Sequence, residues 1–251
     1  MNISVLTIFP ESFESFLKTP VVARAIDKGI VSIDIVDIKD YAKGSFRHID
    51  DSPFGGGAGM VMRCQPVLDA LQAVRDRNPS GDIRSVAMTP AGKPYDQKTA
   101  RRFAELSHLV LLCGHYEGMD ARIFGSIDEE VSMGDYILTG GELPAMTVID
   151  SVVRLLPGAL RGASTEEESF EDGLLEYPQY TQPREYEGMT VPDVLLSGDH
   201  GRIRRYRRQE ALRLTKERRP DLLERYIAEG KLTDEEAELL QELEENRGVS
   251  P

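Results

Sequence analysis

Three glycine-bearing segments that include or follow apolar runs have the composition of ligand-binding loops: residues 85–92, 113–119 and 132–144. Ligands of parallel α/β sheets bind beyond the carboxyl ends of the strands, where such loops lie. Glycine also lets the backbone turn tightly and approach a flat ligand closely. Because residues 113–119 and 132–144 contain no lysine, a small heterocyclic ligand recognised by backbone groups fits them better than a triphosphate. Together the three segments predict one pocket.

A fourth segment, residues 55–59, has four glycines in five positions. A dinucleotide fingerprint would need a glycine where Met60 stands, and the Gly-Lys-Ser/Thr ending of a phosphate-binding loop is missing. The segment is therefore either a flexible loop or a place where backbone approaches a ligand.

The strongest charge pattern is residues 202–219, with nine basic and two acidic residues in a chain of net charge −13. Because local field steers a polyanion, a basic stripe on an acidic protein favours a docking face for phosphates. The alternative is a solvated helix face that pairs with the acidic C-terminal tail.

Composition excludes several other classes. Two cysteines, Cys64 and Cys113, argue against a disulfide scaffold or a zinc module, and the four histidines show no metal-ligand spacing. No basic residue precedes the apolar start at residues 3–9, so a signal peptide is not expected. No run reaches the roughly 20 apolar residues of a membrane span. We therefore predict a cytoplasmic protein with no metal centre formed by its own residues and no membrane partner.

The first half of the chain alternates strand and helix patterns, which predicts an α/β fold with a mainly parallel sheet. The predicted strands are residues 3–9, 31–38, 85–89 and 109–113. The predicted helices are residues 12–29, 65–77, 96–108 and about 142–156.

After residues 157–158 (Pro-Gly) the composition changes, and residues 161–173 are polar, acidic and typical of a flexible linker. Helices without strands are expected beyond it, at about 201–218, 220–229 and 233–245, the last opening with a Thr233/Glu236 capping box. The predicted organisation is an α/β domain at 1–160, a linker at 161–173 and a small all-helical domain at 174–251.

Five motifs occur together and in order: residues 53–60 (PFGGGAGM), 114–118 (GHYEG), 132–138 (SMGDYIL), 140–144 (GGELP) and 176–181 (EYPQYT). This set resembles the bacterial tRNA (guanine-N1)-methyltransferases, which modify the guanosine 3′ of the anticodon at tRNA position 37. The resemblance implies a SPOUT methyltransferase with a deep trefoil knot, a homodimer, a tRNA partner and S-adenosylmethionine as methyl donor. Mg²⁺ is a further cofactor that the family allows.

The resemblance also implies which residues hold S-adenosylmethionine. They are Thr89, Pro90, Gly114, Tyr116, Glu117, Ser132, Met133, Gly134, Asp135, Tyr136, Ile137, Leu138, Gly140, Gly141 and Pro144. Backbone groups suit the edge of adenine, Leu138 and Pro144 supply apolar walls, and Glu117 suits a ribose hydroxyl or the cationic methionine end. For Tyr136 and Leu138, ordinary core packing is the alternative.

Two residues take the family's catalytic positions. Arg154, in residues 151–154 (SVVR), matches the family's cation, whereas Glu168 stands where the family has an aspartate before Ser-Phe. A glutamate carboxylate reaches roughly 1.5 Å further, about one C–C bond, and Glu166 and Glu167 are alternative bases. The basic stripe supplies the expected tRNA contacts Arg202, Arg204, Arg205 and Arg208. The departure at Glu168 leaves open an RNA-binding protein without catalysis, and the resemblance leaves open a methyltransferase of another RNA position.

Overall fold

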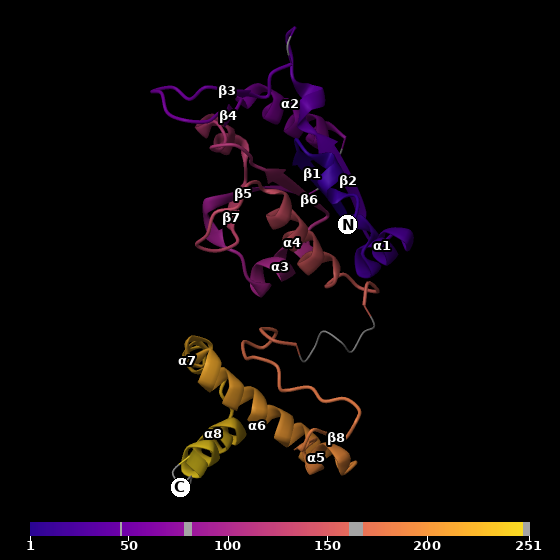
Figure 1. Cartoon of the computed structure of the whole chain (residues 1–251), viewed down its shortest axis with the longest axis vertical. Coiled ribbons are helices and arrows are strands. Elements are labelled where there is room, and N and C mark those ends of the chain that lie inside the picture. Colours follow the sequence, from indigo (N-terminus) through magenta and orange to yellow (C-terminus); the bar gives the residue numbers. More distant parts are fainter. Residues whose placement is uncertain (46, 78–81, 161–167, 248–251) are drawn as a thin grey trace. The chain divides into compact units, whose positions relative to one another are not determined.

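The computed structural model describes residues 1–45, 47–77, 82–160 and 168–247 of the 251-residue chain (Figure 1). The chain divides into two compact units, residues 1–162 and 163–251. Of the expected linker, residues 161–167 lie outside the described part, whereas residues 168–173 form turns that hydrogen-bond within the second unit.

The first unit is built on a five-stranded sheet in the order β2-β1-β6-β5-β7. All neighbouring strands are parallel, as the alternating pattern predicted. The strands are β1 (Asn2–Thr7), β2 (Ser32–Asp37), β5 (Ile83–Pro94), β6 (His108–Cys113) and β7 (Glu129–Ser132). Strand β7 was not predicted, because two of its four residues, Glu129 and Glu130, are charged. It lies at the sheet edge, where charged side chains are tolerated.

Strand β6 is buried along its whole length and separates two hydrophobic clusters. Its alternate residues Leu109 and Leu111 pack on one face with α4 (Glu142–Val153), α3 (Gln97–Ala104) and α1 (Pro20–Asp27). Val110 and Leu112 pack on the other with α2 (Cys64–Asp76) and the 3₁₀ helix η4 (Ala121–Ser126). Helices on both faces explain the continuous apolar run of β6.

The predicted helix at 12–29 is wrong as one element. The structure has two 3₁₀ turns, η1 (Pro10–Phe13) and η2 (Phe16–Lys18), before α1 begins at Pro20. Thr19 is extended, with φ −63° and ψ 145°, because the ring of a following proline disfavours the helical conformation. Helix α3 begins after Asp96, whose carboxylate accepts from the Thr99 N–H, but ends four residues before 108 because His108 starts β6.

The second unit contains α5 (Asp193–Leu196), α6 (His200–Arg218), α7 (Pro220–Ala228) and α8 (Asp234–Arg247). Leu174 of the turn segment packs among side chains of α6, α7 and α8 in a core of its own, formed by Leu174, Leu212, Leu223, Tyr226 and Leu239. The capping box of α8 is confirmed: Glu236 accepts from the Thr233 N–H at 2.8 Å, and Thr233 Oγ1 accepts from the Glu236 N–H at 3.3 Å.

The prediction of an all-helical second domain needs one correction. A short antiparallel hairpin, β8 (Glu185–Tyr186) and β9 (Met189–Thr190), lies in this unit. Its two turn residues, Glu187 and Gly188, have φ values of 51° and 82°, the left-handed pair that closes a tight hairpin. The trefoil knot stays a prediction of the resemblance. None of the helices within the described residues is long and apolar enough to span a membrane.

Candidate active site

A cavity of about 350 Å³ lies at the carboxyl ends of β5, β6 and β7. Three loops surround it, and they are the three predicted from glycine and strand patterns. Every residue that the resemblance assigned to S-adenosylmethionine lines the cavity except Asp135. Thr89 and Pro90 reach it because the pairing of β5 with β7 is interrupted between Met88 and Lys93.

Close backbone packing joins two of these loops. The Gly141 N–H donates to the Gly114 carbonyl at 2.8 Å, and His115 forms a bridge with Gly140. A Cβ added at Gly141 would lie 2.6 Å from Cys113 Cα and 2.9 Å from the Gly114 nitrogen. Only glycine allows this approach, so the Gly-Gly pair before α4 brings the two loops together.

The glycine-rich segment 55–59 supports the same pocket from outside. It connects β3 (Asp50–Asp51) with β4 (Val61–Met62), a small hairpin that the sequence analysis did not predict. The Glu117 N–H donates to the Met60 carbonyl at 3.0 Å. A Cβ at Gly59, where φ is 80°, would lie 2.3 Å from Glu117 Cγ. The segment therefore backs the Glu117 loop and does not itself line the cavity.

Sequence reasoning missed a buried polar group behind the cavity wall. The Glu142 side chain accepts a hydrogen bond from Thr7 Oγ1 at 2.8 Å, and its Oε2 lies 3.9 Å from Nδ1 of His115, a cavity residue. Burial, and secondarily the charge of Glu142, raises the pKa of the Cys113 thiol well above its ordinary value, so Cys113 is neutral packing rather than a nucleophile. The GHYEG and GGELP motifs contained His115 and Glu142, but their contact depends on the fold.

The outer wall of the cavity is apolar and exposed. Tyr136 is 57% exposed, Ile137 80% and Leu138 39%. The core-packing alternative for Tyr136 and Leu138 is therefore wrong within this chain. Both residues line the cavity and are solvent-exposed in this chain, so they are available to a ligand or to another protein surface.

The two catalytic candidates lie in different units. Arg154 is the half-buried C-cap residue of α4. Glu168 belongs to the second unit and lines a cavity of about 260 Å³ there, together with Asp172, Tyr177, Arg204 and further residues. The alternatives Glu166 and Glu167 lie outside the described residues.

The basic stripe proves to be partly neutralised. Arg205 pairs with Glu242 and Glu235, Arg208 with Asp172 and Glu236, and Lys216 with Glu244. The alternative of a helix face paired with the acidic tail therefore holds for these residues. Arg202 and Arg204 differ: both are exposed, and among the described residues neither has a carboxylate within ion-pair distance.

The described residues include no group of three or more His, Cys, Asp or Glu side chains placed to hold a metal ion. We therefore assign no Mg²⁺ site among these residues.

The parallel sheet with a loop-built pocket beyond its strands defines an α/β protein with the kind of site at which such folds bind small molecules. Residues 1–225 match the model of the family described as tRNA (Guanine-1)-methyltransferase TrmD, and the chain belongs to this family. This confirms the resemblance drawn from the five motifs.

Curated relatives cover nearly the whole chain. The tRNA (guanine-N(1)-)-methyltransferase of Listeria innocua is 48% identical over 249 residues, which is 98% of this chain and 100% of that protein. The enzyme of the same name from Staphylococcus epidermidis is 48% identical over 243 residues, 96% of each chain. That from Dictyoglomus turgidum is 47% identical over 244 residues, 97% of this chain and 96% of that protein.

Proposed function

We propose that this protein transfers the methyl group of S-adenosylmethionine to N1 of guanosine 37 in tRNA. The single observation that carries the proposal is the cavity at the ends of β5, β6 and β7, which collects all but one of the residues that the family motifs assign to the methyl donor. Its volume of about 350 Å³ is in the range of small-molecule sites. Because tRNA is modified in the cytoplasm, the proposal also places the protein there.

The pocket's chemistry suits this donor, which supplies an activated methyl group when bound. Backbone groups of the 114–118 and 132–141 loops read the edge of adenine without needing a charged side chain. Ile137, Leu138 and Pro144 form apolar walls. Glu117 offers a carboxylate to a ribose hydroxyl or to the ammonium of the methionine part.

The reaction requires guanine N1 to lose its proton, since only then is its lone pair free. We assign the role of general base to Glu168, which takes that proton. The negative charge left on the ring spreads to O6, where the Arg154 guanidinium offsets it. The N1 lone pair then forms a bond to the methyl carbon as the carbon–sulfur bond breaks and its electron pair stays on sulfur. Alignment of the three atoms accounts for much of the rate.

Methyl incorporation into defined tRNA transcripts tests the proposal. Labelled methyl groups should enter a transcript with guanosine at position 37, and mapping should place them at N1. The same transcript with adenosine 37 should remain unlabelled. Binding of tRNA without any incorporation would favour the RNA-binding alternative, which the replacement of aspartate by Glu168 motivates. Incorporation at another nucleotide would favour a different RNA position.

We further propose that two copies of the chain build the site together, as the family resemblance implies. Arg154 and Glu168 belong to different compact units, and the apolar outer wall of the cavity is exposed in one chain, with Tyr136 57% and Ile137 80% accessible. A homodimer in which each pocket is completed by its partner accounts for both observations.

Mixed dimers test this arrangement. Arg154→Ala and Glu168→Gln subunits should each be inactive alone. If the two residues act from different chains, random mixing should restore roughly a quarter of parental activity, because half of the dimers are mixed and each has one intact site of two. Failure of the mixture to recover any activity would contradict shared sites.

Arg202 and Arg204 are the best candidates for tRNA contacts, because both side chains are exposed and, among the described residues, neither forms a salt bridge of the kind that occupies Arg205 and Arg208. Replacing both by alanine should weaken tRNA binding and lower the slope of log affinity against log salt by about 1 for each phosphate that the arginines neutralise. Affinity for S-adenosylmethionine should not change. Filter binding at several salt concentrations measures the slope, and an unchanged slope would refute phosphate contact by these residues.

A further inference from the structure

The segment that carries Glu168 is an ordered part of the helical unit. The Phe170 N–H donates to the Leu174 carbonyl at 2.7 Å, and the Glu176 N–H donates to Ser169 Oγ at 2.9 Å. The Leu175 N–H donates a 2.9 Å hydrogen bond to Thr215 Oγ1 of α6. With Leu174 1% exposed in the unit's core, the turns at 168–176 are determined by packing against α6.

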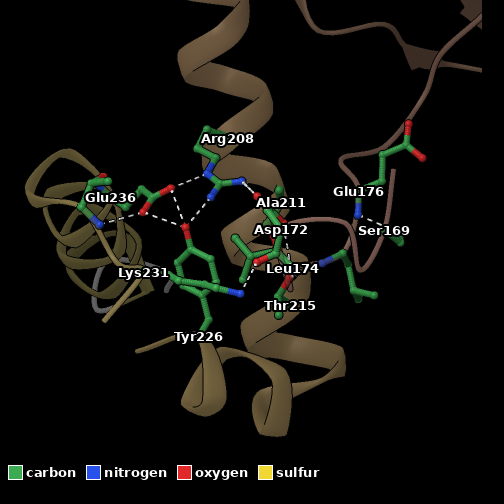
Figure 2. A network of polar contacts seen from close by, with 12 residues as sticks. Ser169, Asp172, Leu174, Glu176, Arg208, Ala211, Thr215, Tyr226, Lys231 and Glu236 are labelled. Carbon is green, nitrogen blue, oxygen red and sulfur yellow. Dashed lines mark hydrogen bonds and ion pairs between the residues drawn. The ribbon is translucent and has the colours of Figure 1, made fainter. Parts of the chain in front are cut away.

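One side chain joins this segment to the rest of the unit. The Arg208 guanidinium contacts Asp172 of the segment at 2.5 Å, Glu236 of α8 at 2.5 Å and the Tyr226 hydroxyl of α7 at 2.7 Å (Figure 2). All three bonds leave different nitrogens of one planar group. Such a fork has a fixed geometry, so the position of two partners determines where the third must lie.

The two helical partners of Arg208 are themselves held in place. Glu236 is 6% exposed and is also the capping-box residue of α8, and the Tyr226 ring is 5% exposed. Burial lowers the pKa of Arg208, but the hydrogen bonds and charges of Asp172 and Glu236 outweigh it and raise that pKa above its ordinary value. The guanidinium is therefore a permanently charged, oriented group that acts on Asp172, whose side chain is 47% exposed.

We propose that Arg208 is a positioning residue that sets the location of the Glu168 carboxylate through Asp172. Glu168, Asp172 and Arg208 line the same cavity of the helical unit, and Asp172 follows Glu168 closely in the chain. The proposal rests on the role of Glu168 as general base. It also replaces the expectation that Arg208 contacts tRNA phosphate, because its nitrogens are already bonded to three protein groups.

Asp172→Asn is the most selective test. Asparagine keeps an oxygen that can accept from the Leu174 N–H. It places an NH₂ donor where a carboxylate oxygen accepted from Arg208, so it removes both the charge and this hydrogen bond. Arg208 keeps its bonds to Glu236 and Tyr226. Since a displacement near 1 Å can cost on the order of 10² in rate, we expect single-turnover methyl transfer at saturating tRNA and S-adenosylmethionine to fall about tenfold. Affinity for tRNA should stay within about twofold.

A double-mutant cycle separates positioning from a general structural effect. If Arg208 and Asp172 act through Glu168, Asp172→Asn should cause no further loss in a Glu168→Gln background. Glu242→Gln, which removes another α6–α8 ion pair without touching residues 168–176, is the matched control and should transfer methyl groups at the parental rate. Arg208→Lys keeps the charge that a phosphate would need but removes the fork, so it should slow transfer without changing tRNA affinity.

Other outcomes would refute either the role of Glu168 as general base or the positioning role of Arg208. A normal rate in Glu168→Gln would remove the general base, and with it the reason for positioning. A slow Glu168→Gln enzyme beside a normal Asp172→Asn enzyme, or multiplicative losses in the double variant, would refute the positioning role alone. Should Asp172→Asn unfold the unit, as circular dichroism would reveal, Arg208→Lys carries the same cycle.

Discussion

Glu168→Gln is expected to lower the rate of methyl transfer by roughly 10²–10⁴-fold, the range that a positioned general base contributes. Glutamine keeps the size and hydrogen-bonding capacity of the side chain but cannot accept the N1 proton. Because Glu168 lines a cavity of the helical unit and not the pocket proposed for the methyl donor, affinity for S-adenosylmethionine should change little. Affinity for tRNA should also change little, because glutamine keeps the size of the side chain. Rapid-quench single-turnover assays measure the loss directly.

The aspartate variant sharpens this test. Glu168→Asp restores the residue type of the family but shortens the side chain by one methylene. A rate near that of the parent would show that the segment at 168–176 places either carboxylate. Unimpaired transfer by Glu168→Gln would rule Glu168 out and make Glu167 the next candidate.

Gly141→Ala is expected to weaken S-adenosylmethionine binding by roughly 10- to 100-fold, the equivalent of 1–3 kcal/mol of overpacking. The new Cβ would meet backbone atoms, Cys113 Cα at 2.6 Å and the Gly114 nitrogen at 2.9 Å. No rotation of a side chain relieves such a contact, so the loops at 114–118 and 140–144 must separate. Isothermal titration with S-adenosylmethionine measures the loss.

Gly125→Ala is the matched control for that substitution. Gly125 lies in η4, and a Cβ there would meet nothing within 4 Å. This variant should bind S-adenosylmethionine as the parent does. Both variants should retain tRNA affinity, because the contacts that we propose for tRNA belong to the other unit. Parental affinity in Gly141→Ala would contradict the view that the close approach of the two loops forms the pocket.

Local sequence patterns were sufficient for the framework of the fold. The apolar run at β6 is unambiguous because a strand covered by helices on both faces is apolar nearly throughout. Strands β1 and β2 contain polar residues, but their β-branched apolar residues still indicate strands. Helix ends with specific chemistry were equally readable, as at Asp96 and at the Thr233/Glu236 capping box, since a cap needs only residues that are neighbours in the chain. The apolar periodicity of residues 12–29 wrongly predicted one continuous helix, because Pro20 disfavours the helical conformation at Thr19.

The pocket was predictable for a related reason. Its lining consists of loops that directly follow strands, and in a parallel sheet those loops must meet at one edge. The motifs in residues 114–118, 132–138 and 140–144 therefore identified nearly all of the cavity. They did not reveal the contact of Glu142 with Thr7, because those residues are 135 positions apart and only the packing of α4 against β1 brings them together.

The basic stripe shows what sequence alone leaves undecided. Composition identified the charge of residues 202–219 and both of its interpretations, phosphate docking and pairing with the acidic tail. Only the packing of α8 on α6 decides which interpretation holds for which arginine. It places Glu242 beside Arg205 and Glu236 beside Arg208. Arg202 and Arg204 are left exposed. The charge of a residue is a local property, but its partner is set by tertiary contacts among distant segments, and those contacts assign Arg208 to Asp172 rather than to solvent.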